Sequence, residues 1–211
     1  MMIDDDDLLK DFVNESREHL ATIEADLLTI EEGGADIDEQ LVNKVFRAAH
    51  SIKGGSGFFG LEKVKELAHR AETVLDMLRS RKIIPNAEVT NILLAAFDKL
   101  REMINDTAGS AEADIADLVV GLTGLASSFL PAEQKASLQS QVTLEGPADL
   151  GQVTIPQTDL DRARRQGQYV YWIDCDLIHD IEQQGQSILT LFKDLFSAGD
   201  VLDCALDYDV V

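Results

Sequence analysis

His50, followed three residues later by Lys53, is the first pattern whose side chains could carry a reaction or bind an anion. On a helix with about 100° per residue, the apolar residues of 38–53 cluster on one side, and His50 falls roughly opposite to them. His50 is therefore predicted to be an exposed imidazole within reach of a partner protein. Lys53 lies on a neighbouring part of the same face, where its ammonium can pair with an anion on His50. Gly54 and Gly57 leave little bulk beside them, although a glycine run is also a common helix terminator.

A second histidine and a glutamate lie on the next predicted helix. His69 and Glu72 are three residues apart on the flank of its apolar stripe, so we expect them to line the groove between the two helices. A carboxylate that accepts a hydrogen bond from Nδ1–H of His50 would fix the tautomer in which Nε2 keeps its lone pair. It would also stabilise the imidazolium formed when Nε2 takes up an electrophile. If the electrophile is a phosphoryl group, the product is a phosphohistidine.

Apolar residues repeat at helical spacing through most of the first 130 residues. Asp38 and Asn86 are suited to cap the second and the fourth helix. Short loops between amphipathic helices predict a mainly α fold, an antiparallel bundle of four or five helices over 1–130. The pattern places these helices at 4–32, 38–53, 61–81, 86–105 and 111–128, the last weakened by internal glycines.

The sequence changes character after the predicted bundle. Residues 131–168 are rich in Gln, Ser, Ala, Asp and Gly, which predicts a flexible linker. Residues 169–211 then show strand, helix and strand patterns, at 169–176, 188–196 and 201–211. They predict a partial β-α-β unit with a thin core. Because the chain stops within the last strand pattern, we interpret it as a fragment of a longer protein.

The composition narrows the classes of partner. Among 211 residues, 39 are acidic and 18 are basic, which gives a formal net charge of -21. This charge argues against unaided binding to nucleic acid or to an anionic membrane. Residues 41–105 alone are basic, with a net charge of +4, which fits either a surface that meets a phosphate or an acidic partner, or an ordinary solvated helix surface.

The remaining features of the composition concern the cellular compartment. The apolar runs fall far short of the roughly 20 residues of a membrane-spanning helix, and no basic start precedes an apolar core near Met1. We therefore expect a cytoplasmic protein without membrane insertion. Cys175 and Cys204 are too few for a disulfide framework and are predicted to be reduced thiols.

Two stretches together resemble a known family. The sequence from Ala48 to Gly60 (AAHSIKGGSGFFG), followed by AHRAE at 68–72, resembles the histidine-containing phosphotransfer (Hpt, P1) domain of CheA-family chemotaxis histidine kinases. The likeness covers about residues 4–128, the amino-terminal domain of that family. It implies an Hpt bundle, and the unit at 169–211 is similar to the start of the α/β open-sandwich module that docks response regulators in this family.

The resemblance assigns a role to each residue of the pattern. It implies that His50 is the phosphorylation site, through Nε2, and that Glu72 orients it by holding Nδ1. Lys53 and His69 match residues around the phosphoryl group, and Gly54 matches the small residue that lets a partner domain approach. The implied function is to accept a phosphoryl group from an ATP-bound kinase domain and pass it to an aspartate of a response regulator.

The resemblance also implies what other chains supply. No motif of an ATP-binding catalytic domain is found, so this chain is not expected to be an enzyme, whereas its parent protein is expected to be a histidine protein kinase. The implied partners are the kinase catalytic domain of a CheA-type protein and a CheY-like receiver domain. No cofactor is expected in this chain, because Mg-ATP is supplied by the kinase domain. The full-length protein would be recruited to membrane receptor arrays.

Three alternatives stay open at this point. The bundle could be an Hpt relay in a non-chemotactic pathway, or a helical adaptor in which His50 is chemically silent. It could also be a metal-binding bundle that uses His50, His69 and Glu72, although a lysine beside three ligands makes a poor cation site.

Overall fold

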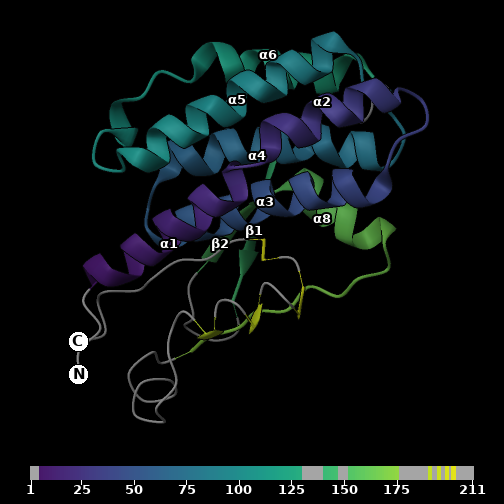
Figure 1. Ribbon diagram of the computed structural model, residues 1–211. Coiled ribbons are helices and arrows are strands. Elements are labelled where there is room, and N and C mark those ends of the chain that lie inside the picture. The colour runs from purple at the N-terminus through teal and green to yellow at the C-terminus, as the bar shows by residue number, and fades with distance from the viewer. Residues whose placement is uncertain are drawn as a thin grey trace. The chain divides into compact units, whose positions relative to one another are not determined.

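The computed structural model describes residues 5–129, 140–146 and 152–175, with short pieces between 190 and 202. The described residues fall into two compact units, one at 5–129 and one that includes 140–146 and 152–175. The first contains the helices α1 to α6 of Figure 1, and the second contains β1, β2 and α8.

The first unit opens with two helices where the sequence pattern predicted one over 4–32. α1 (Asp5–Leu20) and α2 (Ile23–Gly33) are separated by a break at 21–22. Arg101 donates a hydrogen bond to the carbonyl of Leu20 (3.0 Å), and Lys44 donates one to the hydroxyl of Thr22 (2.9 Å). Side chains distant in sequence thus stabilise the break, and hydrophobic periodicity could not predict these contacts.

The next helix, α3 (Glu39–Phe58), carries His50. The cap predicted at Asp38 is confirmed, because its Oδ1 accepts hydrogen bonds from the backbone N–H groups of Gln40 (2.9 Å) and Leu41 (3.3 Å). The predicted end at about residue 53 is wrong, because the glycine-rich sequence continues the helix to Phe58. The helix ends where Gly60 adopts a φ of +64°. There the N–H of Leu61 bonds the carbonyl of Ser56 (2.8 Å), as in a Schellman cap.

The following helices agree more closely with the sequence pattern. α4 (Glu62–Arg79) carries His69 and Glu72, and α5 (Ala87–Asn105) begins at the predicted cap, with Asn86 Oδ1 accepting from the N–H of Val89 (3.0 Å). The weak fifth helix is resolved into the short 3-10 turn η1 (Ser110–Glu112) and α6 (Ala116–Ser128).

α4 lies at the centre of the bundle. It packs against α3, α5 and α6, while α1 and α2 each pack against α3 and α5 (Figure 1). Because only a short turn joins α3 to α4, the two helices form an antiparallel hairpin. Among the described residues, the largest fully buried side chains of α1 to α5 include Leu20, Leu27, Ile52, Leu67, Leu75, Leu78, Leu93, Phe97 and Leu100. Apolar burial of this kind stabilises the frame that holds the site residues.

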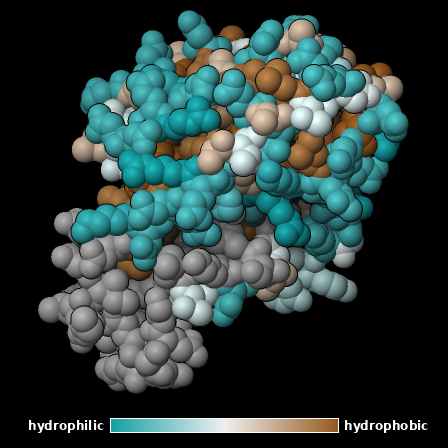
Figure 2. Space-filling view, viewed as in Figure 1, coloured by the Kyte–Doolittle hydropathy of each residue, from teal (hydrophilic) through white to brown (hydrophobic). Residues whose placement is uncertain are grey.

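The outer surface of the bundle is mostly hydrophilic, in contrast to its apolar interior. On the face shown in Figure 2, hydrophilic residues cover most of the surface, and apolar residues show in patches between them. Such a surface agrees with the large net negative charge of the chain.

The second unit differs from the flexible linker predicted over 131–168. β1 (Gln141–Glu145) pairs antiparallel with β2 (Gln152–Pro156), and α8 (Gln157–Arg165) follows directly. Each strand contains a Val–Thr pair followed by Leu or Ile, and the hydroxyls of Thr143 and Thr154 lie 3.1 Å apart across the two strands. The polar composition of the whole range concealed these two short strands.

The strand predicted at 169–176 is also wrong over its described part. Residues 169–175 have no regular secondary structure, and the side chains of Tyr169, Tyr171 and Ile173 are exposed. The aromatic and β-branched composition favours a strand, but the described residues provide no partner strand for it. The helix and strand predicted at 188–196 and 201–211 lie mostly outside the described residues.

Candidate functional site

The buried carboxylate of Glu72 contacts both His50 and Lys53, the two residues of the first pattern in the sequence. Glu72, on α4, is 0% exposed and lies between two side chains of α3. Its Oε1 is 3.2 Å from Nδ1 of His50, and its Oε2 is 2.9 Å from Nζ of Lys53. The antiparallel hairpin of α3 and α4 therefore brings together His50, Lys53 and Glu72. The sequence predicted the approach of Glu72 to His50, but not the ion pair of Lys53 with Glu72.

This geometry selects one tautomer of the imidazole. A carboxylate is only an acceptor, so the N–H at Nδ1 of His50 donates a hydrogen bond to Oε1 of Glu72. In the neutral ring Nε2 then keeps its lone pair and is the nucleophilic nitrogen. A positive charge that develops on the ring is stabilised by the carboxylate at the opposite edge. Within the neutral ring, Nε2 is thus the nitrogen that can react with an electrophile.

His50 was predicted to be exposed, and this prediction is wrong, because only 5% of the residue is exposed. The helical wheel assumed that α3 buries a single stripe, whereas α3 packs against α1, α2 and α4 and is buried on most of its circumference. His50 lies on the side that meets α4. The ion pair of Lys53 and Glu72 is equally buried, and such a pair withstands burial because each charge has its counter-charge in contact.

Two further residues contact the site without having been singled out in the sequence. The ring of Phe46 lies parallel to the imidazole of His50, with 6.0 Å between centroids and 10° between planes. The guanidinium carbon of Arg79 lies 4.0 Å from the centroid of Phe46, over the ring. The spacing of four residues between Phe46 and His50 was a usable signal, because such residues share a helix face. Arg79 carried no comparable signal.

The two remaining predicted residues lie close to this group in the fold. His69 is buried on α4, one turn before Glu72, as its sequence spacing predicted. Gly54 lies inside α3, directly after Lys53, rather than in a loop beyond the helix. Their roles stay predictions.

The metal-binding alternative gains no support from this arrangement. Within the part of the chain that the structure describes, no three His, Cys, Asp or Glu side chains gather as a metal site requires. The ammonium of Lys53 contacts Glu72, where it would repel a cation.

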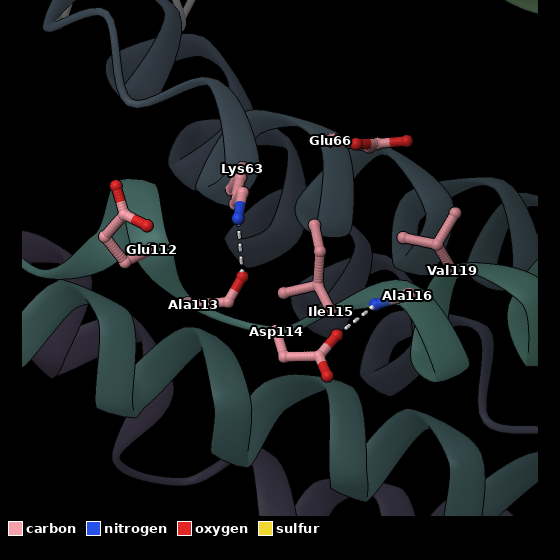
Figure 3. A pocket seen from close by; sticks show the side chains of 8 residues that line it. All are labelled: Lys63, Glu66, Glu112, Ala113, Asp114, Ile115, Ala116 and Val119. Atoms are coloured by element: carbon pink, nitrogen blue, oxygen red, sulfur yellow. Dashed lines mark hydrogen bonds between the residues drawn. The ribbon is translucent and has the colours of Figure 1, made fainter.

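A surface hollow of about 450 Å³ lies elsewhere on the bundle, between α4 and the start of α6 (Figure 3). Lys63 reaches across it and donates a hydrogen bond to the carbonyl of Ala113 (2.8 Å). Asp114 accepts from the N–H of Ala116 (3.1 Å) at the start of α6. These contacts connect α6 to α4, and His50 is not among the lining residues. We therefore assign the hollow a structural role.

Comparison with known proteins shows what the bundle is similar to. Residues 7–109, which include His50, Lys53, His69 and Glu72, match the model of the Hpt domain. This part of the chain is therefore similar to Hpt domains, the histidine-containing phosphotransfer domains.

The curated relatives are more specific. The chain is 42% identical over 123 residues to the chemotaxis protein CheA of Rhizobium meliloti, which covers 57% of this chain and 16% of that protein. It is 28% identical over 211 residues to CheA of Salmonella typhimurium, covering 100% of this chain and 31% of that protein. The chain thus spans less than a third of the length of these two relatives.

A solved structure agrees with this assignment. The phosphorylated P1 domain of CheA3, in complex with CheY6 from R. sphaeroides, is 28% identical with a TM-score of 0.52. The match covers 59% of this chain and 99% of that domain. The predicted Hpt bundle is confirmed.

Over the described residues, no helix is both long enough and apolar enough to cross a membrane.

Proposed function

We propose that this bundle is the phosphoacceptor domain of a chemotaxis-type histidine kinase and that His50 is its phosphorylation site. The observation that carries this proposal is the 3.2 Å contact between Nδ1 of His50 and Oε1 of Glu72. It lies inside the segment matched by the Hpt domain. The contact leaves Nε2 as the nucleophilic nitrogen, which is what phosphoryl acceptance requires.

The first transfer step uses the lone pair of Nε2. It attacks the γ-phosphorus of ATP, the bond from that phosphorus to the bridging oxygen breaks, and ADP leaves with the electron pair. The imidazole keeps its proton on Nδ1 and becomes cationic, and Glu72 stabilises that charge from the other edge of the ring. Lys53 belongs to the surroundings of the phosphoryl group in this proposal, and its ammonium holds Oε2 of Glu72, the carboxylate that orients the ring. His69 contributes to the same surroundings, and Gly54 leaves space for the donor domain.

The second step returns the histidine to its starting state. A carboxylate oxygen of a receiver aspartate attacks the phosphorus, the N–P bond breaks, and Nε2 recovers its lone pair. The R. sphaeroides complex of a phosphorylated P1 domain with CheY6 supports a CheY-like receiver as the acceptor. The names of the relatives favour chemotaxis over another signalling output.

The other components of the relay lie outside this chain. We assign ATP activation and Mg²⁺ to the kinase catalytic domain of a CheA-type protein, so this chain acts as a phosphotransfer substrate and its parent protein as the kinase. The site of action is the cytoplasm, at receptor arrays when the parent protein is recruited to them. Because His50 is 5% exposed, the groups around its ring must give way when a donor approaches.

Intact-mass analysis tests the proposal. The chain is incubated with ATP, Mg²⁺ and a CheA-type kinase that lacks its own Hpt domain, beside the variants His50→Gln and His19→Gln. His19 is a matched control, because it is a histidine of α1 outside the site. We expect one acid-labile phosphoryl group on the wild type and on His19→Gln, and none on His50→Gln. An adduct retained in His50→Gln would refute the assignment.

A further inference from the structure

A parallel ring stack lies on the face of His50, apart from the edge that Glu72 holds. Phe46 precedes His50 by one helical turn of α3, and the two ring planes differ by 10° at a centroid distance of 6.0 Å. Phe46 is 2% exposed, so its ring is confined by the surrounding bundle. A confined aromatic plane beside the imidazole restricts the rotation of that imidazole.

Arg79 connects this ring to α4. Its guanidinium carbon is 4.0 Å from the centroid of Phe46, which is the distance of a cation–π contact. Oδ1 of Asp76 accepts a hydrogen bond from Nη2 of this guanidinium (2.7 Å). Glu72, Asp76 and Arg79 follow one another at spacings of four and three residues, so they share a face of α4. α4 therefore holds His50 directly through Glu72 and indirectly through Phe46.

A hydrogen bond to one ring nitrogen does not by itself fix a ring plane. The terminal torsion of a histidine side chain is broad, so a ring held only at Nδ1 can still tilt about its Cβ–Cγ bond. A contact on the ring face removes that freedom. Since Nε2 is rigidly placed in the ring, fixing one edge and one face determines the direction of its lone pair.

We propose that Phe46, backed by Arg79, is a positioning residue that sets the plane of the His50 imidazole and the direction from which Nε2 meets the phosphoryl donor. This inference rests on the proposed function of His50 and deepens it. Phe46 does not touch the phosphoryl group in this account; it acts through the orientation of His50. In-line transfer is sensitive to such orientation, because small misplacements of reacting atoms slow reactions strongly.

The test compares two phenylalanine variants that make the same chemical change. Phe46→Leu removes the stacked ring, while Phe97→Leu removes an equally buried ring of α5. NMR relaxation of the ¹³C-labelled imidazole of His50 reports how tightly the ring is confined, without any phosphorylation, and initial rates report phosphoryl acceptance. We expect Phe46→Leu to increase the motion of the His50 ring and to slow phosphorylation about tenfold. Phe97→Leu should leave the ring motion and the rate unchanged.

Other outcomes separate the inference from the function on which it rests. Unchanged ring motion and rate in Phe46→Leu, or equal changes in Phe97→Leu, would overturn the positioning role. If the wild type is not phosphorylated, the proposed function fails, while the relaxation of the His50 ring still decides whether Phe46 orients it. Should Phe46→Leu fail to fold, Arg79→Gln provides the second variant. It removes the cation over Phe46 and should shift the same signals in the same direction; unchanged signals would contradict the proposal.

Discussion

At the scale of single residues, the site depends on one carboxylate with two partners. Glu72 accepts a hydrogen bond from His50 and forms an ion pair with Lys53, all within a buried part of the bundle. That His50 and Lys53 share a face of α3 could be predicted from their spacing of three residues, and the approach of Glu72 from its place on the flank of the next helix. The burial of His50 could not, because it depends on which helices surround α3.

Removing this carboxylate should affect both stability and chemistry. Glu72→Ala removes one partner of a buried ion pair, which should lower the free energy of unfolding by about 3–5 kcal/mol. It also removes the acceptor that fixes the tautomer of His50, so phosphorylation should slow. Urea denaturation and initial rates of phosphorylation measure the two effects separately.

The double variant Glu72→Ala with Lys53→Met distinguishes the effect on stability from the effect on the phosphorylation rate. Removing both members of a buried ion pair costs less stability than removing one of them. We expect part of the lost stability to return while phosphorylation stays slow. A double variant that recovered the full rate would show that Glu72 acts on the fold and not on the imidazole.

At the scale of the helices, the glycine-rich sequence after Lys53 has a packing role as well. A Cβ built at Gly55 would lie 2.4 Å from Cε2 of Phe12, so α1 packs directly against the backbone of α3 at this point. The ring of Phe12 also contacts Phe59, with 5.3 Å between centroids. The sequence suggested a helix end here, because a glycine run without its tertiary partners is typical of one.

Gly55→Ala should therefore loosen α1 from α3. We expect a loss of about 1–3 kcal/mol in the free energy of unfolding, since overpacking displaces the ring of Phe12. Gly124→Ala is the matched control, because Gly124 lies in the interior of α6 with nothing within 4 Å of its added Cβ. That variant should gain about 0.5–1 kcal/mol through the higher helix propensity of alanine. Thermal denaturation gives both values, and equal effects of the two changes would contradict the packing argument.

At the scale of the whole chain, the predictions from sequence are strongest where long amphipathic segments pack on one another. Periodicity located α3, α4 and α5, and the caps at Asp38 and Asn86 located two helix starts. The break between α1 and α2 escaped prediction, because Arg101 and Lys44 hold it from elsewhere in the chain. The short strands of 141–156 escaped it too, because five-residue strands are hidden in a polar composition.

The most direct test of the central claim is to locate the phosphoryl group on the phosphorylated chain. Phosphorus–nitrogen correlation NMR of the ¹⁵N-labelled protein identifies the bonded nitrogen, and fragmentation mass spectrometry identifies the residue. We predict a single phosphoryl group on Nε2 of His50, with the proton of Nδ1 still bonded to Glu72. A phosphoryl group on Nδ1 of His50, or on His69, would contradict the account.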